Sequence, residues 1–335
     1  MRGVTVKRKT GRLKTVVIGG GDAFQLHLAG YRRCTMLQLH GVFSSRLAVQ
    51  SQELGVISYP SLEAVLNDPV VDAIDVAVPS SFHAEIALEA ISRGKHVLVE
   101  KPIDIDPVKV RQIIDKSREW GVVAAYVSQF RFSSGIEQIA ELLANNFMGE
   151  LVCVNVALFI NRGESYYRES PWRRDIKLSG GGVLLMNGIH PIDTLIHLLG
   201  VPKVVAAKLE YGPPEGVYGD FERLASVMME FNPAVVANIL VTSYADCNYP
   251  TTLDFIGTKG RAILTEYNIS ALSLQDGRMI RHRIGKSSAT LFAAQLDDFG
   301  RAIRTGNQPR TPIEDGLISL ETVLEAYRIG RSENV

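Results

Sequence analysis

Residues 15–24 read Thr-Val-Val-Ile-Gly-Gly-Gly-Asp-Ala-Phe, and they give the first strong indication of the fold. The apolar run at 15–18 predicts a short buried strand, and the glycines after it permit a tight turn into a helix. Such a turn brings the backbone close to a pyrophosphate, whose charge then meets the N-terminus of that helix. Phe24 stands where the dinucleotide fingerprint has its third glycine, and glycine clusters also mark ordinary turns, so the motif needs support from its context.

The residues that follow supply this context, because short apolar runs alternate with helical segments. Strands are predicted at 36–43, 70–78, 97–99 and 122–127, and helices at 46–54, 82–93 and 108–120. This alternation is typical of an α/β fold with a parallel, doubly wound sheet. A chain of 335 residues, 46% of them hydrophobic, can bury a large core, and we divide it into two domains at 1–127 and 128–335.

The bulk composition excludes several classes of partner. The chain has 36 basic and 36 acidic residues, so no net field steers it to nucleic acid or to a membrane. Its three cysteines, at positions 34, 153 and 247, are far apart and odd in number, which predicts neither a disulfide framework nor a metal site. We find no apolar stretch of about 18 residues and no signal-peptide core. We therefore expect a soluble, cytoplasmic protein.

The end of the second predicted strand bears on coenzyme choice. A dinucleotide enzyme reads the adenosine ribose there, with an acid for a free 2′-hydroxyl or a basic residue for a 2′-phosphate. This chain offers Ser44, Ser45 and Arg46, with no Asp or Glu between residues 40 and 52. The pattern favours NADP over NAD as the cofactor. The alternative is that Arg46 only starts a solvated helix.

The tripeptide Glu100-Lys101-Pro102 follows the buried run His96–Val99. Open α/β folds bind their ligands at the carboxyl edge of the sheet, which is where Lys101 is expected. The reference pKa of lysine is about 10.4, and burial lowers a lysine pKa until the amine can accept a proton. The alternative is an exposed lysine at the end of a strand, with no chemical role.

Further motifs occur in register with the glycine-rich loop: Pro79-x-x-x-His83, Glu100-Lys101-Pro102, and Gly180-Gly181-Gly182 followed by His190 and Asp193. With them the chain resembles the glucose–fructose oxidoreductase / inositol dehydrogenase (Gfo/Idh/MocA) family. The likeness covers nearly the whole length, through 148–152, 256–260 and the tail from Phe292 to Tyr327.

The resemblance implies an N-terminal Rossmann domain and a C-terminal α/β domain on a large, mostly antiparallel open sheet. Its members oxidise a ring hydroxyl of a sugar, nucleotide sugar or cyclitol, or run the reverse reduction, and their sheets often pair into dimers or tetramers. The lysine matching Lys101 contacts substrate and the nicotinamide ribose, and the matching proline is frequently cis. We expect coenzyme contacts from Gly19, Gly21, Asp22, Ala23, Phe24, Ser44, Ser45, Arg46, Pro79, His83, Glu100, Lys101 and Pro102.

His190 is the second catalytic candidate, because an imidazole changes charge near neutral pH. Asp193, close to one helical turn later, could orient it, and Pro191 suits the first turn of a helix. One departure from the family pattern is Met186, where the family carries Asp or Asn four residues before the histidine. Either Asn187 supplies the missing hydrogen bond after a small shift, or Lys101 and His190 act without a third partner.

The segment 161–174 is rich in arginine and aromatic residues. Aromatic rings stack on sugar faces, and guanidinium groups bind phosphate or carboxylate with two hydrogen bonds. An anionic substrate, a solvated basic loop and a subunit contact all fit this composition. We expect substrate contacts from Arg131, Arg162, Tyr167, Arg168, Trp172, Arg173, Asn187 and Asp193.

The leading hypothesis is an NAD(P)-dependent dehydrogenase or ketoreductase of a sugar, sugar phosphate, nucleotide sugar or cyclitol. The alternative is a catalytically silent sensor of dinucleotide or metabolite, which Phe24 and Met186 favour. A third interpretation is an oxidoreductase that keeps its cofactor tightly bound.

Overall fold

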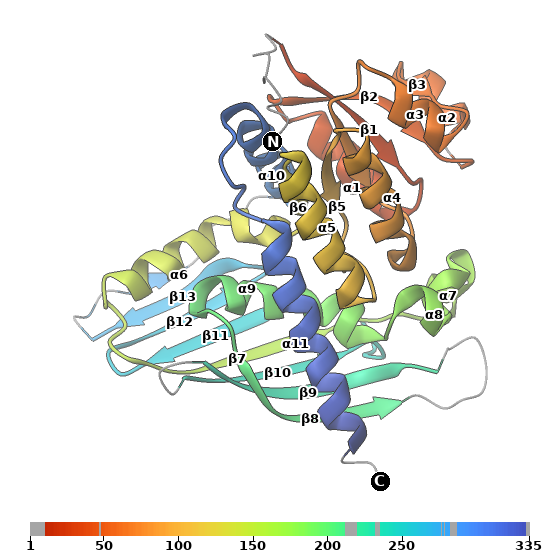
Figure 1. Cartoon of the computed structure of the whole chain (residues 1–335). Helices are drawn as coiled ribbons and strands as arrows, with labels where there is room; N and C mark the ends of the chain where they lie inside the picture. Colours follow the sequence, from red (N-terminus) through yellow and green to blue (C-terminus); the bar gives the residue numbers. More distant parts are fainter. Residues whose placement is uncertain are drawn as a thin grey trace. The chain divides into compact units, whose positions relative to one another are not determined.

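The computed structural model describes residues 11–46, 48–211, 220–231, 235–275, 277, 279–281 and 287–332 (Figure 1). The chain forms two compact units. The first takes the chain up to Gln129 and again from Ser287 to Leu317, and the second takes the chain from Phe130 to Lys286 and from Ile318 onward.

The first unit contains the predicted parallel sheet. Its six strands lie in the order β3-β2-β1-β4-β5-β6. Their bounds are β1 Leu13–Ile18, β2 Leu37–Phe43, β3 Ile57–Ser58, β4 Ala73–Val76, β5 His96–Val99 and β6 Ala124–Tyr126. The strand order reverses direction at β1 and β4, and their carboxyl ends mark the place where open α/β sheets bind ligands. The doubly wound fold predicted from the sequence is therefore confirmed.

Helices connect these strands. They are α1 Asp22–Tyr31, α2 Ala48–Leu54, α3 Leu62–Asn67, α4 His83–Ser92, α5 Pro107–Trp120 and α10 Ser288–Thr305, with a 3₁₀ turn, η1, at Ser80–Phe82. The predicted helices are present with ends shifted by one or two residues. The short elements β3 and α3 escaped prediction, since two and six residues carry too little periodicity.

Helix α10 returns to the first unit from the far end of the sequence. Its Phe292, Leu296 and Phe299 join the core beside Phe24 and Leu28 of α1. Gly30 permits this approach, because a Cβ there would lie 2.4 Å from the Phe292 ring. The division at 1–127 and 128–335 had assigned this helix to the second domain.

The second unit is built on an eight-stranded sheet in the order β14-β13-β12-β11-β7-β10-β9-β8. Only the β7–β10 pair is parallel among the described pairings. The strands are β7 Leu151–Phe159, β8 Lys203–Tyr211, β9 Glu222–Phe231, β10 Val235–Thr242, β11 Thr252–Gly257, β12 Gly260–Thr265, β13 Asn268–Leu274 and β14 Met279–Arg281. The mostly antiparallel sheet implied by the family resemblance is confirmed.

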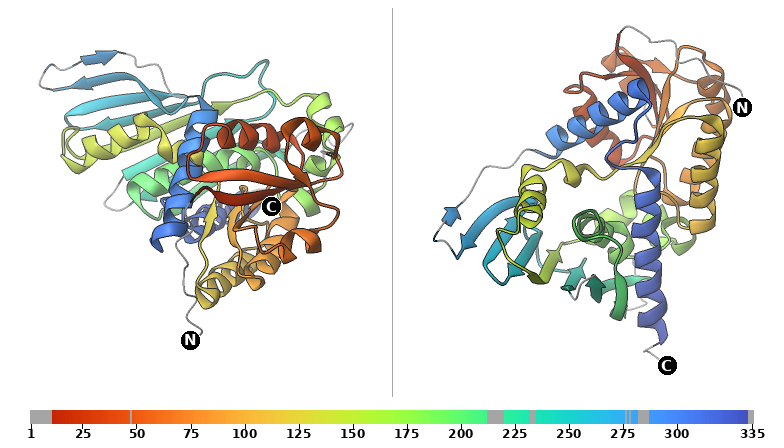
Figure 2. Two further views of the ribbon diagram at one scale, coloured as in Figure 1. Left: turned by 90° about the horizontal axis from the view of Figure 1, so that it is seen from above. Right: turned by 60° about the vertical axis from the view of Figure 1, so that its left-hand side comes forward.

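Helices cover one face of this sheet, as the ribbon views show (Figures 1 and 2). They are α6 Ser134–Ala144, α7 Glu164–Glu169, α8 Ile176–Ser179, α9 Ile189–Leu199 and α11 Ile313–Ser332, with 3₁₀ turns η2 Gln129–Phe132 and η3 Pro171–Arg174. The segment η4, Leu184–Gly188, is a π-helix that runs directly into α9. Strand residues alternate accordingly: Val227 and Met229 are buried, whereas Met228 between them is exposed.

One stretch differs from the expectation that no apolar segment reaches the length of a membrane span. Residues Ile176–Leu199 are long and apolar enough by length and composition to cross a membrane. However, 67% of the most apolar window is buried inside the protein, which is the behaviour of a core helix.

Candidate active site

The glycine turn after β1 has the geometry of a phosphate-binding loop. Gly19 adopts φ +125°, and a Cβ there would lie 2.1 Å from the carbonyl oxygen of Ala77. Gly21 stands before the first residue of α1, provides no side-chain cap, and has open space around the position of a Cβ. The first N–H groups of α1 are thus uncapped by this residue, and a bound anion can accept their hydrogen bonds.

Phe24 does not belong to that loop surface. Its side chain is 1% exposed and packs in the hydrophobic core of the first unit. The Phe24 ring fills the space between helix and sheet, so a coenzyme contact from this residue stays a prediction for its backbone. The third glycine of the fingerprint normally keeps this space small for close helix–strand packing.

The residues expected to read the ribose follow β2 as predicted. Ser45 and Arg46 are exposed, and the Arg46 backbone N–H donates to the Ser44 hydroxyl at 3.2 Å. The contact of these residues with a 2′-phosphate stays a prediction.

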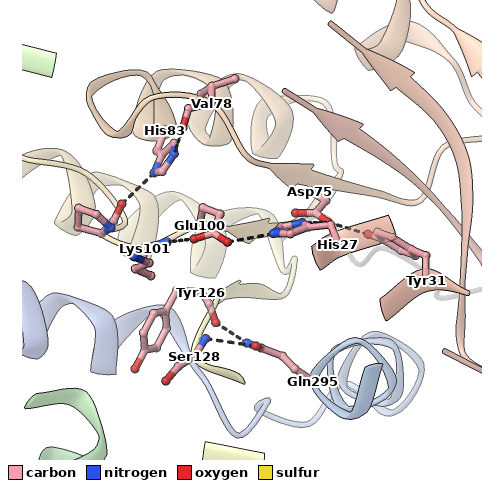
Figure 3. A network of polar contacts seen from close by, with 11 residues as sticks. His27, Tyr31, Asp75, Val78, His83, Glu100, Lys101, Tyr126, Ser128 and Gln295 are labelled. Carbon is pink, nitrogen blue, oxygen red and sulfur yellow. Dashed lines mark hydrogen bonds and ion pairs between the residues drawn. The ribbon is translucent and has the colours of Figure 1, made fainter. Parts of the chain in front are cut away.

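Lys101 follows β5 at the carboxyl edge of the parallel sheet, as the sequence predicted. Its side chain is partly exposed, and its backbone N–H donates to Oε2 of Glu100 at 2.9 Å. The Lys101–Pro102 peptide bond is cis, as the family resemblance implied. Figure 3 shows this turn and the polar contacts around it.

His83 supports the turn from one side. It is 1% exposed, its Nδ1 lies 2.8 Å from the carbonyl oxygen of Pro102, and its Nε2 lies 2.7 Å from that of Val78 (Figure 3). Both ring nitrogens therefore face backbone carbonyl oxygens. His83 thus ties the turn after β4 to the turn after β5, and a coenzyme contact by its ring stays a prediction. Pro79 directly precedes η1, in the turn after β4.

A second histidine, His27, lies behind the same turn and escaped the sequence analysis. Its Nδ1 is 2.8 Å from Oδ2 of Asp75 and its Nε2 is 2.9 Å from Oε1 of Glu100. Tyr31 donates its hydroxyl to the same Asp75 oxygen at 2.9 Å. These residues come from α1, β4 and the end of β5, so only the folded sheet brings them together (Figure 3). Glu100 is 8% exposed and points at His27, so it supports the turn and does not reach a coenzyme through its carboxylate.

The next strand end is fixed from α10. Gln295 is 1% exposed, donates to the Tyr126 carbonyl at 2.7 Å and accepts from the Ser128 N–H at 3.2 Å. This side chain holds the exit of β6 beside the Lys101 turn (Figure 3).

In the second unit, His190 lies in the first turn of α9 and is partly exposed. Its ring meets the Phe130 ring edge-on, with 5.1 Å between the ring centroids. Phe130 in turn stacks on Tyr267, with 3.9 Å between their centroids. The helix does continue upstream of Pro191, through the π-helix η4. A π-helix changes the facing of successive residues and is frequent at functional sites. Lys101 and His190 belong to different units, so their meeting stays a prediction.

Arg131 and Asp193 form a buried pair. The guanidinium donates from Nε to Oδ2 at 2.9 Å and from Nη2 to Oδ1 at 2.6 Å, and Ser319 donates to Oδ1 at 3.0 Å. Arg131 is 0% exposed and Asp193 is 2% exposed. The pair holds η2 against α9, close to His190, and the substrate contacts expected from both residues stay a prediction.

Close packing leaves no room for side chains at Gly181 and Gly182 of the glycine triplet. A Cβ at Gly181 would lie 2.2 Å from the Tyr327 hydroxyl, and one at Gly182 would lie 2.0 Å from the Glu222 carbonyl. The Glu222 carboxylate accepts the N–H groups of Gly182 and Leu184 at 2.9 and 2.8 Å. Burial raises the pKa of Glu222, although these hydrogen bonds oppose the rise.

A narrow pocket lies within the second unit beside this triplet. Its lining is Arg162, Tyr166, Tyr167, Arg173, Gly181, Gly182, Val183, Met186, Asn187, Phe221 and Ser243. The Arg173 guanidinium stacks 3.8 Å above the Tyr166 ring centroid, and that of Arg162 lies 4.8 Å from it. No acidic side chain is among these described lining residues. The pocket can therefore attract an anionic group.

The pocket collects four of the eight predicted substrate residues; besides the buried pair Arg131 and Asp193, two more lie outside it. Arg162, Tyr167, Arg173 and Asn187 line it. By contrast, Arg168 forms an exposed ion pair with Glu164 on α7, and Trp172 lines a separate surface hollow with Pro171 and Arg174.

Comparisons with known proteins agree with this geometry. The family described as "Oxidoreductase family, NAD-binding Rossmann fold" matches residues 13–128, and its C-terminal domain, "GFO/IDH/MocA C-terminal domain", matches residues 136–263.

Two similar proteins and a solved structure match up to 96% of the chain. A 1,5-anhydro-D-fructose reductase of Ensifer adhaerens is 27% identical over 95% of this chain and 97% of its own. A D-glucoside 3-dehydrogenase of Escherichia coli (strain K12) is 32% identical over 57% of this chain and 55% of its own. A levoglucosan dehydrogenase solved with NADH and levoglucosan has the same fold, with a TM-score of 0.87 at 20% identity, over 96% of this chain and 98% of that one.

Proposed function

The chain belongs to the Gfo/Idh/MocA family of oxidoreductases, and we propose that it transfers a hydride between a nicotinamide dinucleotide and a ring hydroxyl or ketone of a sugar, sugar phosphate, nucleotide sugar or cyclitol. Relatives named for an anhydrofructose and a D-glucoside support the choice of a sugar.

One observation carries the proposal: Lys101 stands on a supported turn at the carboxyl edge of the parallel sheet, in the same unit as the Gly19 turn. The glycine turn and the uncapped start of α1 fit a dinucleotide pyrophosphate. When bound, the nicotinamide supplies the site that accepts or donates the hydride.

The protein's own contribution is proton transfer and charge stabilisation. As hydride leaves the carbinol carbon, its hydroxyl must lose a proton, and the Lys101 amine takes it. In the reverse direction the Lys101 ammonium gives that proton to the ketone oxygen. A cation beside the oxygen also stabilises the negative charge that develops there.

His190 is the proposed second catalytic residue, with Asn187 as its polar neighbour. Met186 and Asn187 lie in the π-helix η4, and both line the pocket beside the glycine triplet. The place of Asn187 at this pocket supports it as the hydrogen-bonding partner, a role that the methionine side chain cannot fill.

We infer two features of the ligands. Ser44, Ser45 and Arg46 support a preference for NADP, since a guanidinium is suited to a 2′-phosphate. The arginine-lined pocket supports a substrate with a phosphate or carboxylate, because Arg162 and Arg173 present guanidinium groups to a cavity whose described lining holds no acid.

We further propose that the protein is a cytoplasmic homodimer or homotetramer that pairs through the uncovered face of the eight-stranded sheet. Met228 and Leu240 are exposed on that face, while Val227, Ile239 and Val241 beside them are buried. A contiguous patch of exposed apolar side chains is typical of an interaction surface, and Met228 and Leu240 lie on the neighbouring strands β9 and β10. Light scattering of the purified protein tests this, and a monomer at micromolar concentration would contradict it.

The sensor alternative loses one of its two supports. Phe24 had favoured it as a defect in the coenzyme loop, yet the ring lies in the core and leaves Gly19 and Gly21 to form the turn.

The test is an assay of the pure protein with each dinucleotide and a panel of sugars, sugar phosphates, nucleotide sugars and inositols, following absorbance of the reduced coenzyme. We expect Lys101→Met to lower kcat by a factor of about 100 to 10,000, the usual range for general acid–base catalysis. Lys116→Met, which changes a lysine on α5, serves as the matched control and keeps full activity. Full turnover by Lys101→Met would refute the mechanism, and coenzyme binding without turnover of any panel member would favour the sensor.

A further inference from the structure

The contacts behind Lys101 form a row of alternating charge. Asp75 and Glu100 face opposite nitrogens of His27, at 2.8 and 2.9 Å, and Lys101 follows Glu100 in the chain. His27 and Asp75 are 0% exposed. In the ionised form the row reads minus, plus, minus, plus, from Asp75 to Lys101.

When Asp75 and Glu100 are both ionised, this geometry calls for a charged imidazole. Both partners of the ring are carboxylates, which accept hydrogen bonds and donate none when ionised. A neutral imidazole has a single N–H and would turn a lone pair toward one of the two acids, whereas the imidazolium donates to both. Consistent with this, burial alone would lower the pKa of His27, but Asp75 and Glu100 outweigh it and raise that pKa to about 10.

The same contacts keep Glu100 ionised. Burial works to raise its pKa, but the hydrogen bond and charge of His27, with the charge of Lys101, bring it to about 2. An ionised Glu100 can accept the Lys101 backbone N–H through Oε2 while Oε1 holds His27. The two oxygens thereby link a residue in the helix α1 to the backbone of the catalytic lysine.

We propose that His27 is a positioning residue for Lys101, acting through the Glu100 carboxylate. It fixes the direction of that carboxylate, which in turn fixes the backbone that carries the amine. The groups that face His27 are Asp75 from β4, Glu100 after β5, the Phe292 ring of α10 at 4.3 Å, and Tyr31 through its hydrogen bond to Asp75.

The consequence for activity rests on the proposed function. In His27→Gln, the side-chain NH2 group can still donate a hydrogen bond to one of the two acids. The side-chain carbonyl oxygen can only accept, so it cannot bond to the other ionised acid. Glu100→Gln loses the negative charge that both neighbours use. We expect each to lower kcat by up to about 100-fold, the cost of a displacement near 1 Å at a reacting group. The KM for coenzyme changes less than threefold.

The double variant His27→Gln/Glu100→Gln separates this role from a general loss of stability. Two neutral amides can form a hydrogen bond with each other. We therefore expect the double variant to have a higher kcat than the one obtained by multiplying the fold-losses of the two single variants. Tyr31→Phe is the matched control, since it removes a hydrogen bond from the same Asp75 but leaves Glu100 untouched. It lowers the melting temperature and keeps kcat within twofold. If His27→Gln behaves like Tyr31→Phe, or the two single effects simply multiply, the proposal is overturned.

A readout without turnover keeps the proposal separate from the proposed function. In ¹⁵N-histidine NMR of the full chain at pH 8.5, we expect the His27 ring to show two protonated nitrogens, and Glu100→Gln to remove this signature. In protein methylated with ¹³C at its lysines, the Lys101 resonance, assigned by its loss in Lys101→Met, should move in His27→Gln but not in Tyr31→Phe. A neutral His27 ring at pH 8.5, or an unmoved Lys101 resonance, refutes the inference even if no substrate is found. An inactive wild-type protein that passes both NMR tests refutes the proposed function alone.

Discussion

Arg131 and Asp193 meet through two hydrogen bonds of 2.9 and 2.6 Å, and both side chains are buried. The pair joins η2 to α9, which carries His190. Removing one partner from a buried ion pair leaves an uncompensated charge and typically costs about 3–5 kcal/mol.

We therefore predict that Arg131→Met lowers the free energy of unfolding of the second unit by about 3–5 kcal/mol, as measured by urea denaturation. Replacing both partners, as in Arg131→Met/Asp193→Leu, should recover much of this loss because no buried charge remains. If the double variant is as unstable as the single one, the pair does not carry the stability assigned to it.

The stability of the first unit should depend on pH in two opposite ways. The pKa of His27 is raised to about 10, so its contribution is complete below about 6.5 and is lost as pH rises toward 10. The pKa of His96 is lowered to about 4 by burial, so its contribution is present above about 6.5 and is lost as pH falls toward 4. Melting temperatures measured by circular dichroism should therefore fall both above and below a pH of about 6.5. His27→Gln should flatten the alkaline fall and His96→Asn the acidic one; equal slopes in wild type and variants would contradict the assignment.

The two glycines of the coenzyme turn should respond differently to alanine. At Gly19 the backbone has φ +125° and the added methyl group meets the Ala77 carbonyl, so Gly19→Ala should cost about 1–3 kcal/mol of stability. At Gly21 there is space for the methyl group, so Gly21→Ala should keep the wild-type melting temperature but weaken coenzyme binding. Thermal melts and coenzyme fluorescence titrations measure the two effects. A stable Gly19→Ala protein would show that the turn relaxes.

Arg46 should decide between the two dinucleotides. A hydrogen bond to a charged group contributes about 1.5–3 kcal/mol, and each 1.4 kcal/mol is about tenfold in affinity. Arg46→Ala should thus raise the Kd for NADP at least about tenfold and leave that for NAD within about twofold. Arg33→Ala, an exposed arginine after α1, is the control. Equal losses for both coenzymes would remove the argument for NADP.

The arginine-lined pocket should distinguish anionic from neutral substrates. Arg162→Ala should raise the KM for sugar phosphates or nucleotide sugars about tenfold, as expected for a lost charge-assisted hydrogen bond, and leave the KM for neutral sugars unchanged. Arg168→Ala, which breaks an exposed pair with Glu164, should change neither. A uniform effect of Arg162→Ala on all substrates would assign it a structural role.

Much of the fold could be predicted because its signals are local. The apolar runs before Gly19 and Glu100 are continuous, as strands buried on both faces must be. Helix α5 carries Pro107 in its first turn and ends at Gly121 with φ +63°, and both residues are visible in the sequence. The return of α10 was not predictable, because nothing in residues 288–305 indicates which unit their apolar face will cover.

The site divides in the same way. Lys101 and the glycine turn stand out because strand ends concentrate function in an open α/β sheet. His27, Asp75 and Glu100 are separated by 48 and 25 positions, and parallel strands bring them together without any sequence periodicity. Arg131 and His83 carry residue types suited to ligands, but only their burial reveals that they are occupied with other parts of the protein.

The return of α10 also sets the order of events during synthesis. Phe24 and Leu28 gain their partners Phe292, Leu296 and Phe299 only after the ribosome has made the segment Phe130–Lys286 of the second unit. At translation rates of about 5–20 residues per second, the nascent first unit waits on the order of ten to thirty seconds with that face of α1 uncovered. A newly made chain is therefore a candidate for chaperone binding at α1 during this interval. A chain truncated before residue 287 lacks α10, so the hydrophobic core of its first unit stays incomplete.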